Sequence, residues 1–135
     1  MAITPYLLYE DVGKALTFLS NAFGFREVGG TMKGPDGRIH HAAMQLDSDV
    51  IMMGCPGTDY RNPKHLGHVT VNLYVTIDDV DKHFEHARSA GAAILETPKN
   101  TEYGHRRYGA TDPEGHAWYF AQELHATHER REKPA

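Results

Sequence analysis

Apolar residues alternate with polar or aromatic ones over residues 69–75, a two-residue period typical of a β-strand. The period then changes to three and four residues, which predicts a helix over about 80–87, capped by Asp78 or Asp79 and closed by Gly91. Further alternating runs predict three strands, at 92–96, 103–111 and 116–122. The second half of the chain therefore predicts the order strand, helix, three strands.

The first half of the chain predicts the same order. A short strand over about 3–9 precedes a helix whose cap is Asp11, with Glu10 as the alternative, and Gly24 ends that helix. Three strands then follow, at 25–28, 38–46 and 50–54. Residues 55–67 are rich in Pro, Gly and polar residues and are expected to form a linker. The tail, 123–135, has no apolar stripe, and we expect it to be frayed.

The two halves also match residue by residue. A shift of 68 residues places Asp11 on Asp79, and the same shift places Tyr6 on Tyr74. Such repetition indicates two copies of one unit, in which a helix covers one face of four strands and leaves the other face bare. We therefore predict an α+β fold within one domain, 1–135. Two tandem βαβββ modules, at about 3–54 and 68–122, form facing curved mixed sheets around a cup, with the helices outside. Chance similarity between two ordinary halves is the alternative.

The last hairpin has the clearest local chemistry. Asp112-Pro-Glu-Gly115 has the residues that a type I turn favours, and the strand after it is rich in aromatic residues. Alternation places Trp118 and Phe120 on one face of that strand and Tyr119 on the other. Because a hairpin alone cannot keep Trp118 and Phe120 dry, we expect them to pack in the core.

Composition excludes several classes of function. Hydrophobic residues make up 40% and charged residues 24% of the 135 residues, with a formal net charge of −4, as in an ordinary soluble protein. This charge gives no reason to expect nucleic acid or an anionic membrane as a partner. Cys55 is the only cysteine, so no intrachain disulfide forms, and we expect a cytoplasmic location. The first residues do not resemble a signal peptide, and no apolar run is long enough to span a membrane.

The doubled unit and its motifs resemble the glyoxalase I/bleomycin-resistance protein/extradiol dioxygenase superfamily, also called the vicinal oxygen chelate fold. The resemblance covers about residues 3–122. Its most specific segments are Ile3-Thr-Pro-Tyr-Leu7, Ala22-Phe-Gly-Phe25, Tyr103-Gly-His-Arg-Arg-Tyr108 and Asp112-Pro-Glu-Gly-His116. Single-domain, glyoxalase-like members commonly have Asp where this chain has His105. The resemblance implies the cup-shaped fold and a homodimer, but it implies no particular reaction because the superfamily hosts several chemistries.

The resemblance also implies where a metal ion would be bound. Metal-using members hold the ion at four symmetric positions, which correspond here to Thr4, Met52, Asn72 and Tyr119. None of these is the His or carboxylate that a divalent cation prefers, so we expect a cup without metal or other cofactor. Helical pairing of His83 with His86 is an alternative chelating arrangement that lacks a third ligand.

The bare faces of the strands supply the candidate ligand-binding residues. If the apolar side of each strand faces its helix, the opposite side faces the cup. The candidates are Tyr6, Leu8, His41, Met52, Asn72, Tyr74, Arg107 and Tyr119. Arg106 and Arg107 point to opposite faces, and alternation leaves open which of them enters the cup; the candidate retained is Arg107.

This mostly apolar and aromatic lining suits a small, planar or amphipathic organic ligand. Two functions stay open: binding without catalysis, as in sequestration, and an enzyme that uses Tyr or His as acid and base or an unrecognised metal site. For each lining residue, core filling or a dimer contact is the alternative role.

Overall fold

The structure is a computed structural model that describes residues 1–124, and it contains two similar modules. Module 1 consists of β1 (Tyr6–Leu8), α1 (Val12–Phe23), β2 (Arg26–Lys33), β3 (Ile39–Leu46) and β4 (Asp49–Gly54). Module 2 consists of β5 (Asn72–Thr76), α3 (Val80–Ser89), β6 (Ala93–Asn100), β7 (His105–Thr111) and β8 (Ala117–Glu123). Both modules therefore have the predicted order of strand, helix and three strands.

Each module builds one four-stranded mixed sheet with the same strand order. The orders are β1-β4-β3-β2 and β5-β8-β7-β6, and in each sheet the first pair is parallel and the other pairs are antiparallel. The register also repeats, because Tyr6 pairs with Met52 in module 1 as Tyr74 pairs with Tyr119 in module 2. The predicted α+β class and the βαβββ repeat are confirmed.

The two long helices begin at the predicted aspartates. The side chain of Asp11 accepts a hydrogen bond from the backbone N–H of Lys14 at 3.1 Å, and Asp79 does the same for Lys82 at 3.1 Å. These contacts satisfy donors that the first turn of a helix leaves without partners. Gly24 then ends α1 in the left-handed region, at φ 84°, where a side chain would be strained.

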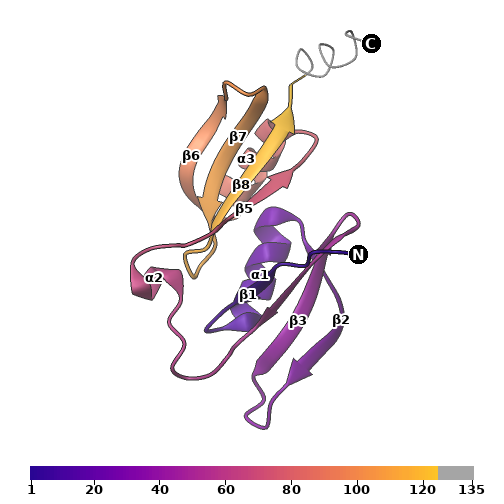
Figure 1. The fold of residues 1–135 in the computed structure, drawn as a ribbon, viewed down its shortest axis with the longest axis vertical. Helices are drawn as coiled ribbons and strands as arrows, with labels where there is room; N and C mark the ends of the chain where they lie inside the picture. The colour runs from indigo at the N-terminus through magenta and orange to yellow at the C-terminus, as the bar shows by residue number, and fades with distance from the viewer. Residues whose placement is uncertain (125–135) are drawn as a thin grey trace.

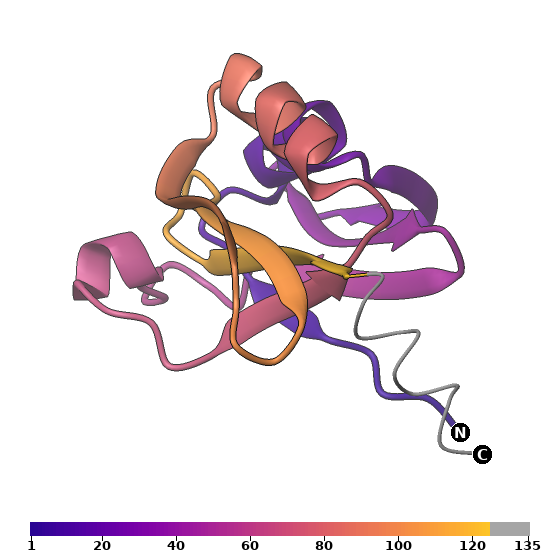
Figure 2. The same cartoon turned by 90° about the horizontal axis from the view of Figure 1, so that it is seen from above.

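The modules lie one above the other along the long axis, with β1 and β5 near their junction (Figure 1). Seen from above, α1 and α3 lie together on one side of the molecule and the strands lie on the other (Figure 2). Because each helix covers one face of its own sheet, the bare faces of both sheets lie on the side away from the helices. None of the helices in residues 1–124 has the length and apolar content needed to cross a bilayer.

One hydrophobic core joins the two modules. The ring of Phe23, at the end of α1, lies 4.8 Å from Phe120 and 5.6 Å from Trp118 of β8, measured between ring centroids. Trp118 and Phe120 are fully buried, as the alternation predicts. Phe23 of module 1 therefore covers part of the apolar face of module 2, and buried residues of both modules form one cluster.

The two helical histidines also connect the modules. One ring nitrogen of His83 lies 2.6 Å from the Tyr108 hydroxyl and the other lies 3.2 Å from the carbonyl oxygen of Phe23. His86 contacts the carbonyl oxygen of Asn21 at 2.8 Å. Burial lowers the pKa of His83, which favours its neutral form. These contacts occupy both nitrogens of His83, so the chelating alternative does not fit its geometry.

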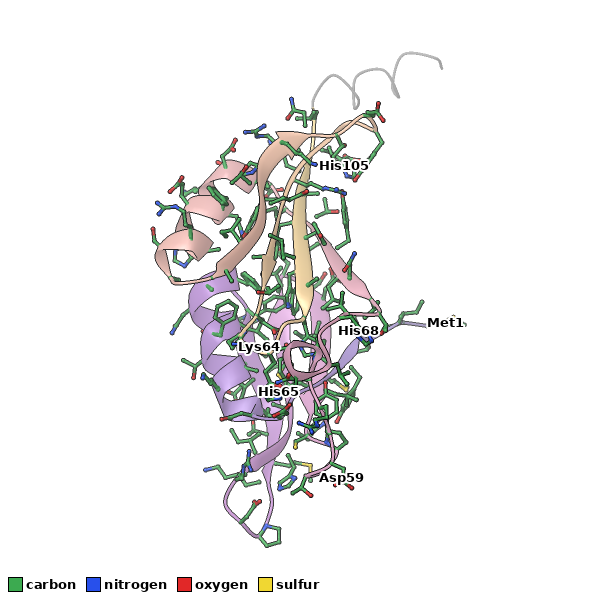
Figure 3. The ribbon with its side chains drawn as sticks, turned by 90° about the vertical axis from the view of Figure 1, so that its left-hand side faces the viewer. Met1, Asp59, Lys64, His65, His68 and His105 are labelled. Atoms are coloured by element: carbon green, nitrogen blue, oxygen red, sulfur yellow. The ribbon has the colours of Figure 1, made fainter. Side chains whose placement is uncertain are left out.

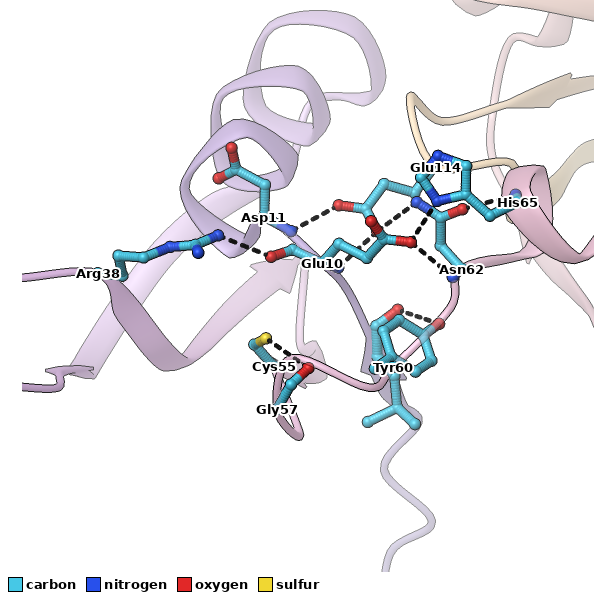
Figure 4. A network of polar contacts seen from close by, with 10 residues as sticks. Glu10, Asp11, Arg38, Cys55, Gly57, Tyr60, Asn62, His65 and Glu114 are labelled. Carbon is cyan, nitrogen blue, oxygen red and sulfur yellow. Dashed lines mark hydrogen bonds and ion pairs between the residues drawn. The ribbon is translucent and has the colours of Figure 1, made fainter. Parts of the chain in front are cut away.

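Polar groups of both modules form a set of hydrogen bonds, here called the junction cluster (Figure 4). It consists of the side chains of Glu114 and Asn62 and the backbone N–H groups of Glu10 and Asp11. Glu114, from the turn of the last hairpin, is only 7% exposed and accepts hydrogen bonds from the backbone N–H groups of Glu10 at 2.6 Å and Asp11 at 2.8 Å. It also accepts one from the side-chain amide of Asn62 at 3.0 Å. A carboxylate of module 2 thus supplies partners for the backbone at the start of α1 in module 1.

Asp112 extends the junction cluster into the core. Its carboxylate accepts hydrogen bonds from the Tyr9 hydroxyl at 2.6 Å and from the Trp118 indole at 3.1 Å. Burial acts to raise the pKa of Asp112, but hydrogen bonds from His116, Tyr9 and Trp118 outweigh it and hold this pKa below its usual value. Asp112 is therefore ionised at neutral pH although it is buried.

The expected linker contains one element that the sequence did not predict. The short helix α2 (Pro63–Leu66) begins after Asn62, whose side chain accepts a hydrogen bond from the backbone N–H of His65 at 2.9 Å. Four residues are too few to show a helical period, so only the cap and the proline at the first position could have indicated it. At the other end of the chain, β8 extends to Glu123, and the rest of the expected tail, 125–135, lies outside the described residues.

The junction cluster makes a testable prediction about stability. Replacement Glu114→Ala leaves the backbone donors of Glu10 and Asp11 without their partner, so the free energy of unfolding should fall by about 2–3 kcal/mol. Urea unfolding followed by circular dichroism measures this change. The matched control is Glu102→Ala, at an exposed position in a turn, which should change stability by less than about 0.5 kcal/mol. Equal effects in the two variants would contradict the role of Glu114.

Candidate functional site

The bare face of module 2 carries an aromatic ring next to a glycine. Tyr119 of β8 is opposite Gly109 of β7, and a Cβ atom at Gly109 would come within 2.6 Å of the Tyr119 ring. Because Gly109 has no side chain, the Tyr119 ring has room to lie next to β7. Tyr74 of β5 pairs with Tyr119 on the other side, and 44% of its surface is exposed.

Arg107 lies on this same face, above Tyr119. Its guanidinium carbon is 5.3 Å from the centroid of the Tyr119 ring, a cation–π distance. Its Nε donates to Glu96 at 2.8 Å and its Nη1 donates to the hydroxyl of Tyr103 at 2.8 Å. Arg106 instead pairs with Asp81 of α3 at 3.1 Å, so it lies on the helix side. Of the two adjacent arginines, Arg107 is the one on the bare face.

A chain of hydroxyl and imidazole groups borders Arg107. The Tyr74 hydroxyl lies 3.4 Å from the Tyr103 hydroxyl and 2.7 Å from Nδ1 of His105. The hydrogen bond with Tyr74 and the positive charge of Arg107 lower the pKa of Tyr103, whereas desolvation and this same pairing raise the pKa of Tyr74 to about 12. Tyr103 is therefore the phenol of the pair that loses its proton first.

The sequence did not predict three members of this group: Glu96, Tyr103 and His105. Tyr103 was expected to begin a strand, but it lies in the turn before β7, where strand alternation does not assign a face. Figure 3 shows His105 in the upper module, away from His65 and His68 near the junction. Within this segment, strand alternation pointed only to Arg106 and Arg107, and the family resemblance gave Tyr103 and His105 no role.

Module 1 presents a second, simpler group on its bare face. The Tyr6 hydroxyl lies 3.0 Å from Nδ1 of His41, and Tyr6 pairs with Met52 across β1 and β4. A Cβ atom at Gly54 would come within 2.5 Å of the Tyr6 hydroxyl, so here too a glycine leaves room for a tyrosine. Leu8 follows on the same side of β1, and 51% of Tyr6 and 39% of Leu8 are exposed. The candidates of module 1 therefore lie together.

Residues of both modules line the seam between β1 and β5. A hollow of about 440 Å³ at one end is lined by residues of both strands, including Tyr6, Leu8 and Leu73. Another, of about 550 Å³, is lined by Thr4 and Tyr74. Asn72, at the start of β5, is exposed beside this seam. Of the eight candidates, Tyr6, Leu8 and Tyr74 line these hollows, and the others lie on the strands of their own modules.

The four positions that correspond to metal ligands do not suit a cation. Met52 and Tyr119 offer a thioether and a phenol, and Thr4 and Asn72 offer neutral oxygens. The structure adds that the guanidinium of Arg107 lies over the ring of Tyr119, so a positive charge already occupies that corner. Within residues 1–124, His, Cys, Asp and Glu form no group of three placed to hold a metal ion. These four positions do not suit a metal ion because their donor atoms are unsuitable and because Arg107 places a positive charge beside Tyr119.

Comparison with known proteins agrees with this architecture. The family model for the glyoxalase/bleomycin resistance protein/dioxygenase superfamily matches residues 3–120. The chain belongs to this superfamily. An uncharacterised protein of Mycobacterium tuberculosis is 32% identical over 127 residues, which cover 90% of this chain and 74% of that protein.

Solved structures of the superfamily show the same fold. TioX from Micromonospora sp. ML1 is 31% identical, with a TM-score of 0.73 over 92% of this chain and 99% of that chain. The fosfomycin resistance protein FosX from Mesorhizobium loti is 15% identical, with a TM-score of 0.64 over 97% of each chain. At that identity, the likeness to FosX shows the fold alone.

The lowered pKa of Tyr103 can be measured directly. Spectrophotometric titration of the phenols should show ionisation beginning below the usual tyrosine pKa of about 10, and Tyr103→Phe should remove that first step. In Arg107→Met the step should move to higher pH, because a stabilising positive charge is lost. Tyr60→Phe is the control, since burial raises the pKa of Tyr60 to about 12. An unchanged first step in Tyr103→Phe contradicts the assignment.

Proposed function

We propose that this protein binds a small, largely apolar or aromatic organic molecule on the bare faces of its sheets, in a cup without metal. The observation that carries the proposal is the exposure of aromatic and apolar side chains there: Tyr6, Leu8 and Tyr74 are each more than a third exposed. Exposed apolar surface next to polar groups that can orient a ligand is typical of ligand sites. Sequestration of such a molecule, without reaction, is the simplest use of this surface.

A second copy of the chain would complete the cup. The strands of both modules lie on the side of the chain away from α1 and α3 (Figure 2), so a molecule bound there would be open to solvent. A two-fold pair could place module 1 of one copy against module 2 of the other, because the two modules have the same architecture. The seam residues Leu8 and Val71, both exposed, would then be covered. This supports a homodimer.

Pairing can be tested by light scattering of the purified chain. We expect a mass twice that of the chain at micromolar concentration. Leu8→Asp should shift the population to monomer, because it places a charge in the apolar seam. The control is Leu95→Asp, at an exposed position on β6 away from the seam, which should leave the mass unchanged. A monomeric wild-type protein that binds ligand would show that one chain suffices.

Acid–base catalysis is the second candidate function. The lowered pKa of Tyr103 and its contact with the Tyr74 and His105 pair favour it, because these groups can hold and pass a proton. The two functions differ in one observable. A compound recovered unchanged after long incubation supports binding alone, whereas conversion to a product establishes an enzyme.

A thermal-shift screen of small aromatic compounds tests the binding proposal. Tyr119→Ala and Asn72→Ala should fold, and each should weaken the affinity for a compound found in the screen by about tenfold. Asn100→Ala is the control, since Asn100 contacts Arg106, the arginine on the helix side. Absence of any stabilising compound, or equal weakening in the control, would contradict the proposal. Unfolding of both site variants would show that these side chains belong to the core.

A further inference from the structure

We propose that the bare face of module 2 selects aromatic ligands that carry an anionic group, and that Arg107 and Tyr103 bind the anion. This inference rests on the proposed function and names the ligand class of the same surface. The pair is called the anion subsite below.

Two hydrogen bonds hold the guanidinium of Arg107 in place, and this group has further N–H donors. Nε is fixed by Glu96 and Nη1 by Tyr103, each at 2.8 Å. Among the described residues, no acceptor lies on Nη2. An arginine already oriented by two contacts loses little freedom when an anion binds, and its planar donors match carboxylate, sulfonate and phosphate oxygens. Arg107 can therefore bind an anion without leaving its present position.

Two cations and one carboxylate are in direct contact at the subsite. Lys99 of β6 is the cross-strand partner of Arg107, and the carboxylate of Glu96 contacts both cations, with Lys99 Nζ at 3.3 Å. Lys99 and Arg107 thus share one carboxylate. The next carboxylate along β8, Glu123, is opposite His105 at the outer end of the sheet. We therefore place the anion on the Tyr119 side of Arg107, away from Glu123.

The aromatic part of the ligand has a surface beside this charge. The Tyr119 ring lies between the backbone at Gly109 and the guanidinium, so the open ring surface beside this charge belongs to Tyr74 and Tyr103, which are 44% and 55% exposed. Rings stack on such a surface with favourable offset geometry. A planar ring on this surface would bring an attached anionic group to Nη2 of Arg107 and the hydroxyl of Tyr103.

The internal repeat shows that this charge is particular to module 2. The register makes His41 the counterpart of Arg107, because Ala43 pairs with Met52 as Gly109 pairs with Tyr119. His41 contacts Tyr6 and has no permanent charge. The tyrosine is kept in both modules, Tyr6 and Tyr74, whereas the cation occurs in one. The two faces therefore offer an apolar half and an anion-binding half.

Two fluorescent probes that differ only in the anionic group test the inference. They are 8-anilinonaphthalene-1-sulfonate and its uncharged counterpart N-phenyl-1-naphthylamine, titrated into the full chain. The wild-type protein should bind the sulfonate about tenfold more tightly than the uncharged probe. Arg107→Met should remove that advantage and leave the affinity for the uncharged probe within about twofold, and Tyr103→Phe should reduce the advantage about threefold.

Arg106→Met is the matched control, because the neighbouring Arg106 binds Asp81 and Asn100 on the helix side. It should leave both affinities unchanged. Arg107→Lys keeps the charge and replaces Arg107→Met if the latter does not fold; it should bind the sulfonate more weakly than wild type and retain part of the preference.

The outcomes separate this inference from the proposed function. Equal affinities of the wild-type protein for the two probes, or equal losses in the Arg106 and Arg107 variants, overturn the anion subsite while binding itself stands. Failure of both probes to bind the wild-type protein overturns the proposed function and the subsite with it.

Discussion

The contact between the two modules determines which surfaces of the molecule are available for binding. Glu114 of module 2 accepts the backbone donors at the start of α1 in module 1, and Phe23 of module 1 packs on Trp118 and Phe120 of module 2. The polar contact and the core lie on the helix side, so they place α1 and α3 next to each other. As a consequence, the opposite faces of both sheets are left for ligand or for a second copy.

Those two bare faces share a plan but differ in chemistry. In module 1, Tyr6 of the first strand lies near Gly54. In module 2, Tyr74 of the first strand pairs with Tyr119, whose ring lies against Gly109. On each face a glycine therefore leaves room for an aromatic ring. Met52 and His41 of module 1 correspond to Tyr119 and Arg107 of module 2. The repeated unit therefore explains the fold, and the differences between its copies explain the proposed choice of ligand.

The sequence predicted the architecture well because its signals were local and repeated. The capping residues Asp11 and Asp79, the closing Gly24 and the alternation around Trp118 all report on contacts within one module. The short helix α2 was missed because four residues carry no period. The same alternation put the eight candidate residues on the strand faces away from the helices, and their role in binding a ligand stays a prediction.

The parts that the sequence did not predict depend on contacts between distant residues. Glu114 looked like a turn residue, and only the packed modules show that it caps a helix more than 100 positions earlier. Tyr103 belongs to a turn whose orientation no periodicity specifies, so its contact with Arg107 required coordinates. The choice between Arg106 and Arg107 likewise depended on Asp81 of α3, an element of the opposite face.

We propose that ligands bind on the strand side, away from the helices. Amide chemical-shift mapping by NMR, with 8-anilinonaphthalene-1-sulfonate as the probe, locates the bound molecule on the structure. The largest shifts should fall on β5, β7 and β8, around Tyr74, Arg107 and Tyr119. Shifts concentrated on α1 and α3, with these strands unaffected, would contradict this proposal.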